Sequence, residues 1–255
     1  MRRARVGRVD LIGGGPGPVD LMTIRAHRLL MAADVVVADR LGPFHELREE
    51  LAPHVEVIDV GKRPGNHPVP QHEINALLVE RALSGLRVVR LKGGDPFVLG
   101  RGGEEVLACE AAGVPVTVTP GVSSAISVPQ AAGIPVTHRG VASAVHIVNG
   151  HGDLSAGALA SLDDPTVTTV VLMGVAALPK LVSAATDHHV SGETPVAIVE
   201  NGHTERQRTI HTTIRDAVED AAAAQVVNPA VIVIGAVARA GLLLPTTAMI
   251  AQSMT

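Results

Sequence analysis

Apolar residues in the first half of the chain fall into short continuous runs separated by segments of helical spacing. The runs occupy residues 9–12, 35–38, 55–60, 88–91 and 116–118. Between them, apolar positions recur every three or four residues over 23–33, 71–84 and 103–112, which predicts helices, the first capped by Asp20 or Thr23. Fully apolar strands that alternate with helices predict a parallel sheet covered on both faces.

The second half of the chain is less regular. Residues 145–148, 167–172, 196–199, 209–212 and 231–234 have the composition of strands, and residues 176–185 and 213–224 have helical spacing. The turn-rich segment 133–140 lies where the pattern changes. We therefore expect two α/β domains, residues 1–137 and 138–255, with a cleft between them.

Composition excludes several classes of function. The core must be aliphatic, because the chain has two phenylalanines and neither tyrosine nor tryptophan. It therefore lacks the aromatic platforms on which single-stranded nucleic acid stacks, and its formal net charge of −4 also argues against a general nucleic-acid binder. The most apolar segment, residues 230–245, contains Arg239 and is shorter than the roughly 20 residues that span a bilayer.

The cysteine content and the start of the chain indicate a cytoplasmic protein. The single cysteine, Cys109, cannot form an internal disulfide or supply a cysteine-rich metal site, which is typical of a reducing compartment. Residues 2–5 are rich in arginine, but no apolar stretch follows them, so we expect no secretory signal.

Glycine-rich loops follow the predicted strands of the first half. Residues 13–17 read Gly-Gly-Gly-Pro-Gly and residues 93–96 read Gly-Gly-Asp-Pro. Open parallel sheets bind ligands beyond the carboxyl ends of their strands, where such loops present backbone N–H groups. Two phosphate-binding motifs do not fit. Pro18 stands where a dinucleotide fingerprint needs its third glycine, and Lys62 is followed by Arg63 instead of the Ser or Thr of a P-loop.

Cations gather near the predicted strand ends of this acidic chain: Arg40, Lys62, Arg63, Arg90, Lys92 and Arg101. Guanidinium forks bind carboxylates well, so this set suits a polycarboxylate ligand unless the residues are ordinary solvated charges. The histidines do not suggest zinc, because no second histidine follows His72-Glu73 at zincin spacing and the adjacent His188 and His189 cannot share a helix face. We expect no catalytic metal.

Long stretches of the chain resemble the uroporphyrinogen-III C-methyltransferases of the tetrapyrrole methylase family. The most specific stretch is residues 92–105, KGGDPFVLGRGGEE, within a matching run that begins at residue 88. Further matching segments occur in order along nearly the whole chain, at residues 13–17, 33–36, 39–41, 60–63, 71–75, 120–125, 133–140, 173–174, 194–197, 199–202 and 207–208.

The resemblance implies an enzyme that transfers two methyl groups from S-adenosylmethionine to uroporphyrinogen III, giving precorrin-2 for sirohaem and cobalamin synthesis. It implies a homodimer, with the cofactor and its product S-adenosylhomocysteine in the cleft between the two α/β domains and with no metal. The implied acid–base residues are Asp39 and Lys62, and Arg40, Arg63 and Arg101 would bind the acidic arms of the substrate. The implied cofactor contacts are Pro16, Gly93, Gly94, Asp95, Val98, Ser123, Ser124, Met173 and Gly202.

Three alternatives stay open. Ala38 replaces an aromatic residue usual in the family and Pro18 interrupts its Gly-Asp-Pro, so the substrate could be a later precorrin. A non-catalytic S-adenosylmethionine-binding regulator is the second alternative, and it requires Asp39 and Lys62 to be dispensable. A nicotinamide-dependent oxidoreductase is the third, against which the broken glycine fingerprint counts.

Overall fold

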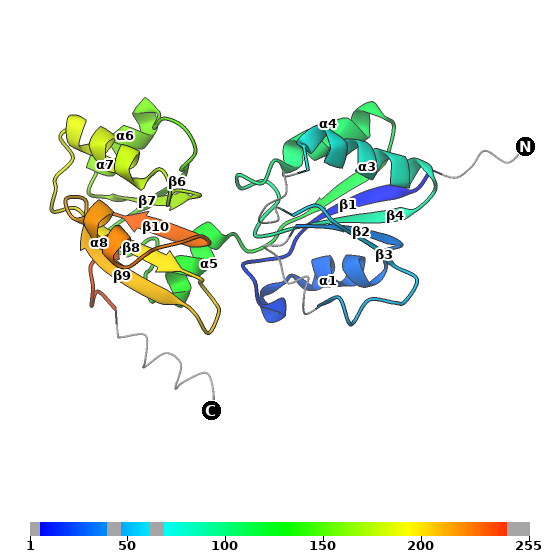
Figure 1. The fold of residues 1–255 in the computed structure, drawn as a ribbon, viewed down its shortest axis with the longest axis horizontal. Helices are drawn as coiled ribbons and strands as arrows, with labels where there is room; N and C mark the ends of the chain where they lie inside the picture. Colours follow the sequence, from blue (N-terminus) through cyan, green and yellow to red (C-terminus); the bar gives the residue numbers. More distant parts are fainter. Residues whose placement is uncertain (1–5, 40–46, 62–68, 244–255) are drawn as a thin grey trace, which may run out of the picture. The chain divides into compact units, whose positions relative to one another are not determined.

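The computed structural model describes residues 6–39, 47–61 and 69–243 (Figure 1). The chain divides into two compact units, Met1–Ser124 and Ala125–Thr255. This division lies earlier than the boundary after residue 137 that the sequence suggested. The reason is helix α5 (Ser124–Ala131), whose Ala125 and Val128 pack into a hydrophobic cluster of the second unit.

The first unit is built on a five-stranded sheet of order β3-β2-β4-β1-β5, and its pairings are parallel. Helix α1 (Ile24–Met31) covers one face, and helices α3 (Gln71–Leu83) and α4 (Gly102–Ala111) cover the other. The predicted parallel sheet with helices on both faces is confirmed. Its strands are β1 (Arg8–Gly13), β2 (Val35–Ala38), β3 (Glu56–Asp59), β4 (Arg87–Lys92) and β5 (Val116–Thr119).

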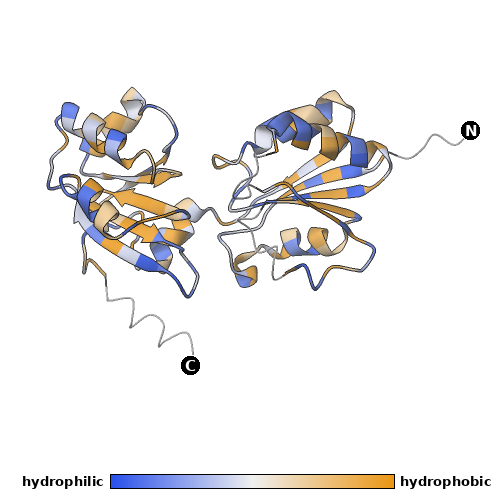
Figure 2. Ribbon diagram, in the orientation of Figure 1, coloured by the Kyte–Doolittle hydropathy of each residue, from blue (hydrophilic) through white to orange (hydrophobic). Residues whose placement is uncertain are grey.

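Side chains of β4 alternate between the two faces of this sheet. Val89 and Leu91 pack in the cluster that contains α1, whereas Val88 packs in the cluster beneath α3 and α4. Arg90 and Lys92 share the face of Val88, because side chains two residues apart lie on the same side of a strand. Figure 2 shows hydrophilic residues interrupting the strands of this sheet. The layer under α3 and α4 is therefore apolar at the start of β4 and charged at its carboxyl end.

The second unit has a five-stranded sheet of order β6-β7-β10-β8-β9. Strands β6 (Ala144–Asn149) and β7 (Val167–Leu172) are parallel, while the pairings of β8 (Pro195–Glu200), β9 (Arg208–Thr213) and β10 (Ala230–Ile234) are antiparallel. Helices α6 (Ala156–Asp163), α7 (Leu178–Asp187) and α8 (Ala217–Ala223) pack on one face, and α5 packs on the other. This mixed sheet explains the less regular pattern of the second half.

A side-chain cap sets the start of α1, and strand pairing sets that of α8. The Thr23 hydroxyl accepts the Ala26 N–H at 3.2 Å, so Thr23, one of the two expected caps, begins α1. Helix α8 starts at Ala217, later than expected, because residues through Thr213 pair with β8. Two short 3-10 helices, η1 (Val19–Leu21) and η2 (Ala236–Ala238), complete the described elements.

Candidate active site

The loops that follow β1, β4 and β5 meet through their backbones at the carboxyl edge of the first sheet. The Gly94 N–H donates to the Gly15 carbonyl at 2.7 Å, and the Gly15 N–H donates to the Gly94 carbonyl at 3.2 Å. A Cβ at Gly121 would lie 2.2 Å from the Gly94 carbonyl oxygen and 2.8 Å from the Cα of Gly13. Glycine is therefore required at Gly121, and backbone groups, not side chains, form this edge.

Asp95 ties two of these loops together. Its Oδ1 accepts the Phe97 N–H at 2.8 Å, and its Oδ2 accepts the Gly121 N–H at 3.1 Å. An ionised carboxylate has about four acceptor sites, so each oxygen keeps capacity for a ligand donor. Asp95 therefore holds the β4 and β5 loops in register while it remains able to bind a hydroxyl or an amine.

The other cofactor candidates of the first unit flank this edge. Gly93 is half-buried and Gly94 is buried, and the half-buried Pro16, Val98 and Ser123 lie in the same three loops. Ser124, also half-buried, follows directly as the first residue of α5. Two apolar side chains stand exposed beside them, Phe97 at 60% and Leu99 at 39%. The edge thus combines backbone polar groups with an uncovered apolar surface, as a site for a partly apolar ligand requires.

Met173 and Gly202 lie at strand ends of the second unit. Met173 directly follows β7 and is 38% exposed, and Gly202 follows β8 in a loop packed on helix α5. His203 donates from Nε2 to the Ser127 carbonyl at 2.9 Å, and Gln207 donates to the Ala131 carbonyl at 3.0 Å. Gln207 also accepts the His203 N–H at 2.8 Å, so the loop is fastened to α5 at both of its ends.

Five of the seven described non-glycine residues with a left-handed backbone lie at or beside these positions, the other two being His189 and Gln225. The φ angle is 55° at Leu99, 59° at Arg101, 58° at Met173, 52° at Asn201 and 65° at His203. Left-handed backbone is unfavourable for such residues and persists where the surrounding structure enforces it. Its placement beside the candidate residues in both units favours these loops as functional sites.

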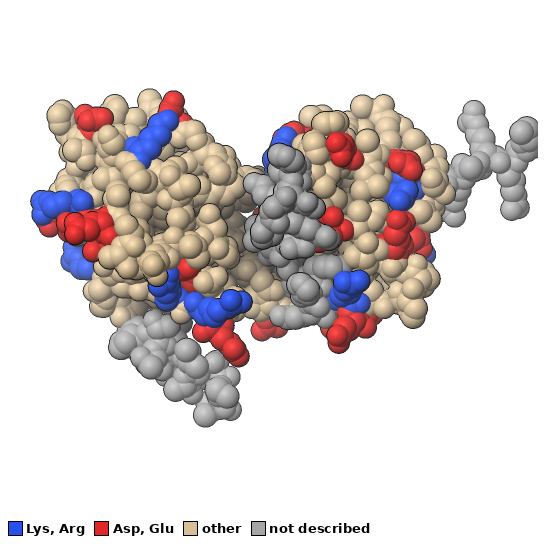
Figure 3. Space-filling view, in the orientation of Figure 1, with Lys and Arg blue, Asp and Glu red and all other residues tan. Residues whose placement is uncertain are grey.

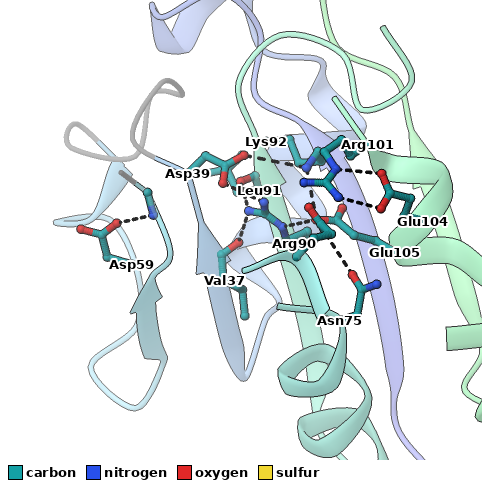
Figure 4. Close-up of polar contacts among 12 residues, drawn as sticks. Val37, Asp39, Asp59, Asn75, Arg90, Leu91, Lys92, Arg101, Glu104 and Glu105 are labelled. Atoms are coloured by element: carbon teal, nitrogen blue, oxygen red, sulfur yellow. Dashed lines mark hydrogen bonds and ion pairs between the residues drawn. The ribbon is translucent and has the colours of Figure 1, made fainter. Parts of the chain in front are cut away.

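Asp39, the candidate proton acceptor, directly follows β2. Its N–H donates to the Leu91 carbonyl at 3.1 Å, which fixes the residue against β4. Its Oδ1 accepts a hydrogen bond from Nη2 of Arg90 at 2.7 Å, and its Oδ2 lies 3.9 Å from Nζ of Lys92 (Figure 4). The other candidate acid–base residue, Lys62, lies outside the described residues.

Arg90 and Lys92 belong to a buried network with Glu105 of helix α4. Glu105 Oε1 accepts from Arg90 Nε at 2.9 Å, from Lys92 Nζ at 3.2 Å and from Gln71 Nε2 at 3.2 Å. Arg90, Lys92 and Glu105 are 1%, 4% and 1% exposed. These two cations were expected to bind substrate carboxylates, and that expectation is wrong: they are enclosed beneath α3 and α4, already paired with carboxylates of the protein.

Burial and charge act in opposite directions on the two cations. Burial alone would lower the pKa of Arg90, but the carboxylates of Asp39 and Glu105 outweigh it and the pKa is raised. The pKa of Lys92 is lowered, because burial and the charge of Arg90 outweigh the attraction of Glu105 and Asp39. Arg90 is therefore a permanent cation, and Lys92 is the member of the pair that loses its proton more readily.

Arg101, the candidate for substrate binding, has a different setting. Its side chain is 58% exposed and forms a two-pronged ion pair with Glu104, at 2.7 Å and 2.8 Å. An exposed pair of this kind can exchange its partner for a ligand carboxylate at little cost. The other two candidates, Arg40 and Arg63, lie outside the described residues. On the face drawn in Figure 3, Lys and Arg side chains are scattered and lie beside Asp or Glu.

Within residues 6–39, 47–61 and 69–243, no group of three or more His, Cys, Asp or Glu residues is arranged to hold a metal ion. No helix in the same ranges is long and apolar enough to cross a membrane. Two hollows in the second unit, of about 200 Å³ and 230 Å³, contain none of the candidate residues and are smaller than typical ligand pockets.

Comparison with known proteins adds a second line of evidence. Residues 8–218 match the family model of the Tetrapyrrole (Corrin/Porphyrin) Methylases. The chain is 44% identical over 239 residues to the uroporphyrinogen-III C-methyltransferase of Paracoccus denitrificans, covering 92% of this chain and 83% of the relative. It is 46% identical over 241 residues to that of Methanocaldococcus jannaschii, covering 91% and 96%.

A solved structure is similar over the same range. The uroporphyrin-III C-methyl transferase of Thermus thermophilus, crystallised with S-adenosylhomocysteine, superposes with a TM-score of 0.74 at 39% identity. The match covers 91% of this chain and 98% of that one. The similarity therefore extends through both units.

Proposed function

Because this chain belongs to the tetrapyrrole methylases, we propose that it transfers methyl groups from S-adenosylmethionine to uroporphyrinogen III, twice, to give precorrin-2. The observation that carries the proposal is its similarity to two uroporphyrinogen-III C-methyltransferases over 83% and 96% of their lengths. The described part of the site agrees with such chemistry, because a solvent-reaching carboxylate, Asp39, stands at the carboxyl edge of the first sheet.

The residues present suit S-adenosylmethionine. Its sulfonium supplies an activated methyl group, so the protein needs to align it with a carbon nucleophile and no metal is demanded. Backbone groups of Gly93 and Gly94, with the Asp95 carboxylate, are suited to the polar parts of the molecule. The exposed thioether of Met173 is suited to an apolar part. We assign Pro16, Val98, Ser123, Ser124 and Gly202 to the same site.

Asp39 is the proton acceptor in this proposal. After methyl transfer a proton must leave the macrocycle, and a carboxylate near the edge of the site can take it. Lys62 would orient the substrate or donate a proton. Lys62→Ala should then slow turnover while S-adenosylhomocysteine still binds; full activity in this variant would remove Lys62 from the mechanism.

Arg101 is the best-placed described group for the acetate and propionate arms of the substrate. Its guanidinium is exposed, and its present partner Glu104 is itself exposed. Arg40 and Arg63 are assigned the same role. Arg101→Lys should raise the KM for uroporphyrinogen III more than that for S-adenosylmethionine, because an ammonium cannot form the two-pronged contact.

The test is an anaerobic incubation of the purified protein with S-adenosylmethionine and uroporphyrinogen III, followed by mass spectrometry of the tetrapyrrole. Gain of two methyl groups is the expected result, and Asp39→Asn should reduce the rate strongly without abolishing S-adenosylhomocysteine binding. Cofactor binding without methylation would instead favour a later precorrin as substrate, and the same incubation with such precorrins would reveal it. Binding without methylation of any of them would favour a regulator.

We further propose that the enzyme acts in the cytoplasm as a homodimer, with a small-molecule tetrapyrrole as its partner and without nucleic acid or membrane. The single, fully buried thiol of Cys109 is consistent with a reducing compartment. Light scattering coupled to gel filtration measures the dimer directly, and a monomer mass at micromolar concentration would contradict this part of the proposal.

A further inference from the structure

Asp39 is the solvent-reaching member of the buried charge network. Its side chain is 29% exposed, against 2% for Arg90, 5% for Lys92 and 1% for Glu105. The three enclosed residues cannot reach a substrate the size of a tetrapyrrole. Of these four residues, Asp39 is therefore the one that can contact the substrate directly.

The two oxygens of Asp39 have different surroundings. Oδ1 accepts the hydrogen bond from Arg90 Nη2 at 2.7 Å. In the described part of the chain, Oδ2 lies 3.9 Å from Nζ of Lys92, which is beyond hydrogen-bond distance. One oxygen is thus occupied by a permanent cation, and the other accepts no hydrogen bond from the described residues.

Hydrogen bonds from every nitrogen of the Arg90 guanidinium hold it in one orientation. Besides Asp39, it donates from Nε to Glu105 at 2.9 Å and from Nη1 to the carbonyls of Val37 and Leu91 at 3.3 Å and 3.1 Å (Figure 4). The guanidinium is planar, so these partners on two strands and a helix fix both its position and its tilt. A carboxylate bonded to so rigid a donor loses its freedom to rotate.

Glu105 carries this constraint to the helical layer. Its Oε1 also accepts from Gln71 of α3, and Gln71 donates in turn to Asn75 at 2.9 Å. A continuous chain of hydrogen bonds therefore runs from helices α3 and α4, through Glu105 and Arg90, to the Asp39 carboxylate. Figure 4 shows Asp39, Arg90 and Glu105 side by side in this network.

We infer that Arg90, held by Glu105, is a positioning residue that directs Oδ2 of Asp39 toward the proton that leaves the methylated macrocycle. In this step a bond from the macrocycle to hydrogen breaks, an O–H bond forms at Oδ2, and the electron pair stays with the macrocycle. Arg90 keeps its own proton. Asp39 becomes a neutral carboxylic acid, protonated at Oδ2, the oxygen that Arg90 does not bind. The inference rests on the proposed function and adds to it the residues that set the geometry of the base.

A double-mutant cycle between Arg90→Lys and Asp39→Asn tests it. Lysine keeps the charge but cannot reproduce the fork, so Arg90→Lys should lower kcat by about 10²-fold, the usual effect of a misplaced catalytic group. The KM for uroporphyrinogen III and the Kd for S-adenosylhomocysteine should stay within about twofold. In the Asp39→Asn background the same change should lower kcat by less than about threefold, because the positioned base is already lost.

Matched variants keep the test independent of folding. Arg81→Lys is the control, since Arg81 also bonds two carboxylates, Glu56 and Glu80, and belongs to no proposed site; its kcat should not change. If Arg90→Lys does not fold, Gln71→Met replaces it, because this variant leaves all four charges in place. Gln71→Met should give a smaller loss of kcat that likewise disappears with Asp39→Asn.

The outcomes separate this inference from the proposed function. Equal kcat losses in both backgrounds would mean that Arg90 acts independently of Asp39 and would overturn the inference, as would a wild-type kcat for Arg90→Lys. A wild-type protein that binds S-adenosylhomocysteine but methylates no uroporphyrinogen III would overturn the proposed function instead.

Discussion

Gly202→Ala should disturb the loop that carries a proposed cofactor contact, because the added methyl group would clash with Val128. A Cβ at Gly202 would lie 2.6 Å and 2.8 Å from the two γ-carbons of Val128, whereas carbon atoms pack at about 3.5–4.0 Å. One partner must therefore move by about 1 Å. The loop is held by the bonds of His203 and Gln207 to helix α5, and Val128 is 6% exposed in the core, so neither moves freely.

The expected cost is that of overpacking a closed interior, about 1–3 kcal/mol. If the loop yields, this cost appears as S-adenosylhomocysteine affinity weakened roughly 5- to 150-fold, since 1.4 kcal/mol is a factor of ten. If the core yields, it appears as a fall in the unfolding midpoint of about 2–4 °C per kcal/mol for a chain of this size. Isothermal calorimetry and thermal unfolding measure the two parts.

Val128→Ala is the second variant that tests this mechanism. It removes both γ-carbons, so the double variant Val128→Ala/Gly202→Ala should bind S-adenosylhomocysteine more tightly than Gly202→Ala alone. The reasoning is refuted if Gly202→Ala has the affinity and the unfolding midpoint of the wild type. It is also refuted if the effects of the two substitutions simply add, because contact between the two sites predicts coupling.

Three further predictions concern single residues. Burial and the charges of Glu105 and Glu110 raise the pKa of the Cys109 thiol to about 11, so about 0.1% of the thiol is thiolate at pH 8. A disulfide reagent should therefore label Cys109 rapidly after unfolding but not before. Fast labelling of the folded enzyme would contradict the burial of Cys109. The pKa of Lys92 is lowered in the fold from an unfolded value of about 10.4, so the unfolded chain binds more protons between the two values and stability there rises with pH. In urea unfolding, the free energy of the wild type should therefore rise relative to Lys92→Met as the pH approaches about 10.4, and a constant difference would show that Lys92 is not perturbed. Asp95→Ala removes the acceptor of two loop N–H groups and should weaken S-adenosylhomocysteine binding about tenfold or more, whereas unchanged affinity by calorimetry would remove Asp95 from the cofactor site.

Strands and most helices follow directly from local pattern. The run Val35–Ala38 is β2 without any change of boundary, and Thr23 caps α1 through its own hydroxyl. Both features depend on neighbours within a few residues, which a linear sequence displays. Helices α5 and α6 were not predicted. Pro129 lies inside α5 and is locally unfavourable for a helix, and the packing of α5 with Val170 and Val199 compensates for that preference.

The candidate site divides in the same way. The glycine-rich loops and Asp95 could be chosen from their place after the strands, whereas the roles of Asp39 and Arg101 were implied by the family resemblance. Glu105 could not be assigned a role, although the two-residue spacing of Val88, Arg90 and Lys92 was a usable signal that these cations share the helix-covered face of β4. That signal does not reveal which carboxylates meet them.

The sequence alone thus determined the element types, the parallel first sheet and the set of polar groups at its carboxyl edge, since these depend on periodicity and on local chemistry. Only the tertiary structure decided what each charge does. Arg90 meets Asp39 across 51 residues of sequence and Glu105 across 15, through a strand crossing and a helix that fold back on the sheet. Burial of those contacts pairs Arg90 and Lys92 with the protein's own carboxylates instead of a ligand, because a charge removed from water must be satisfied by the protein itself.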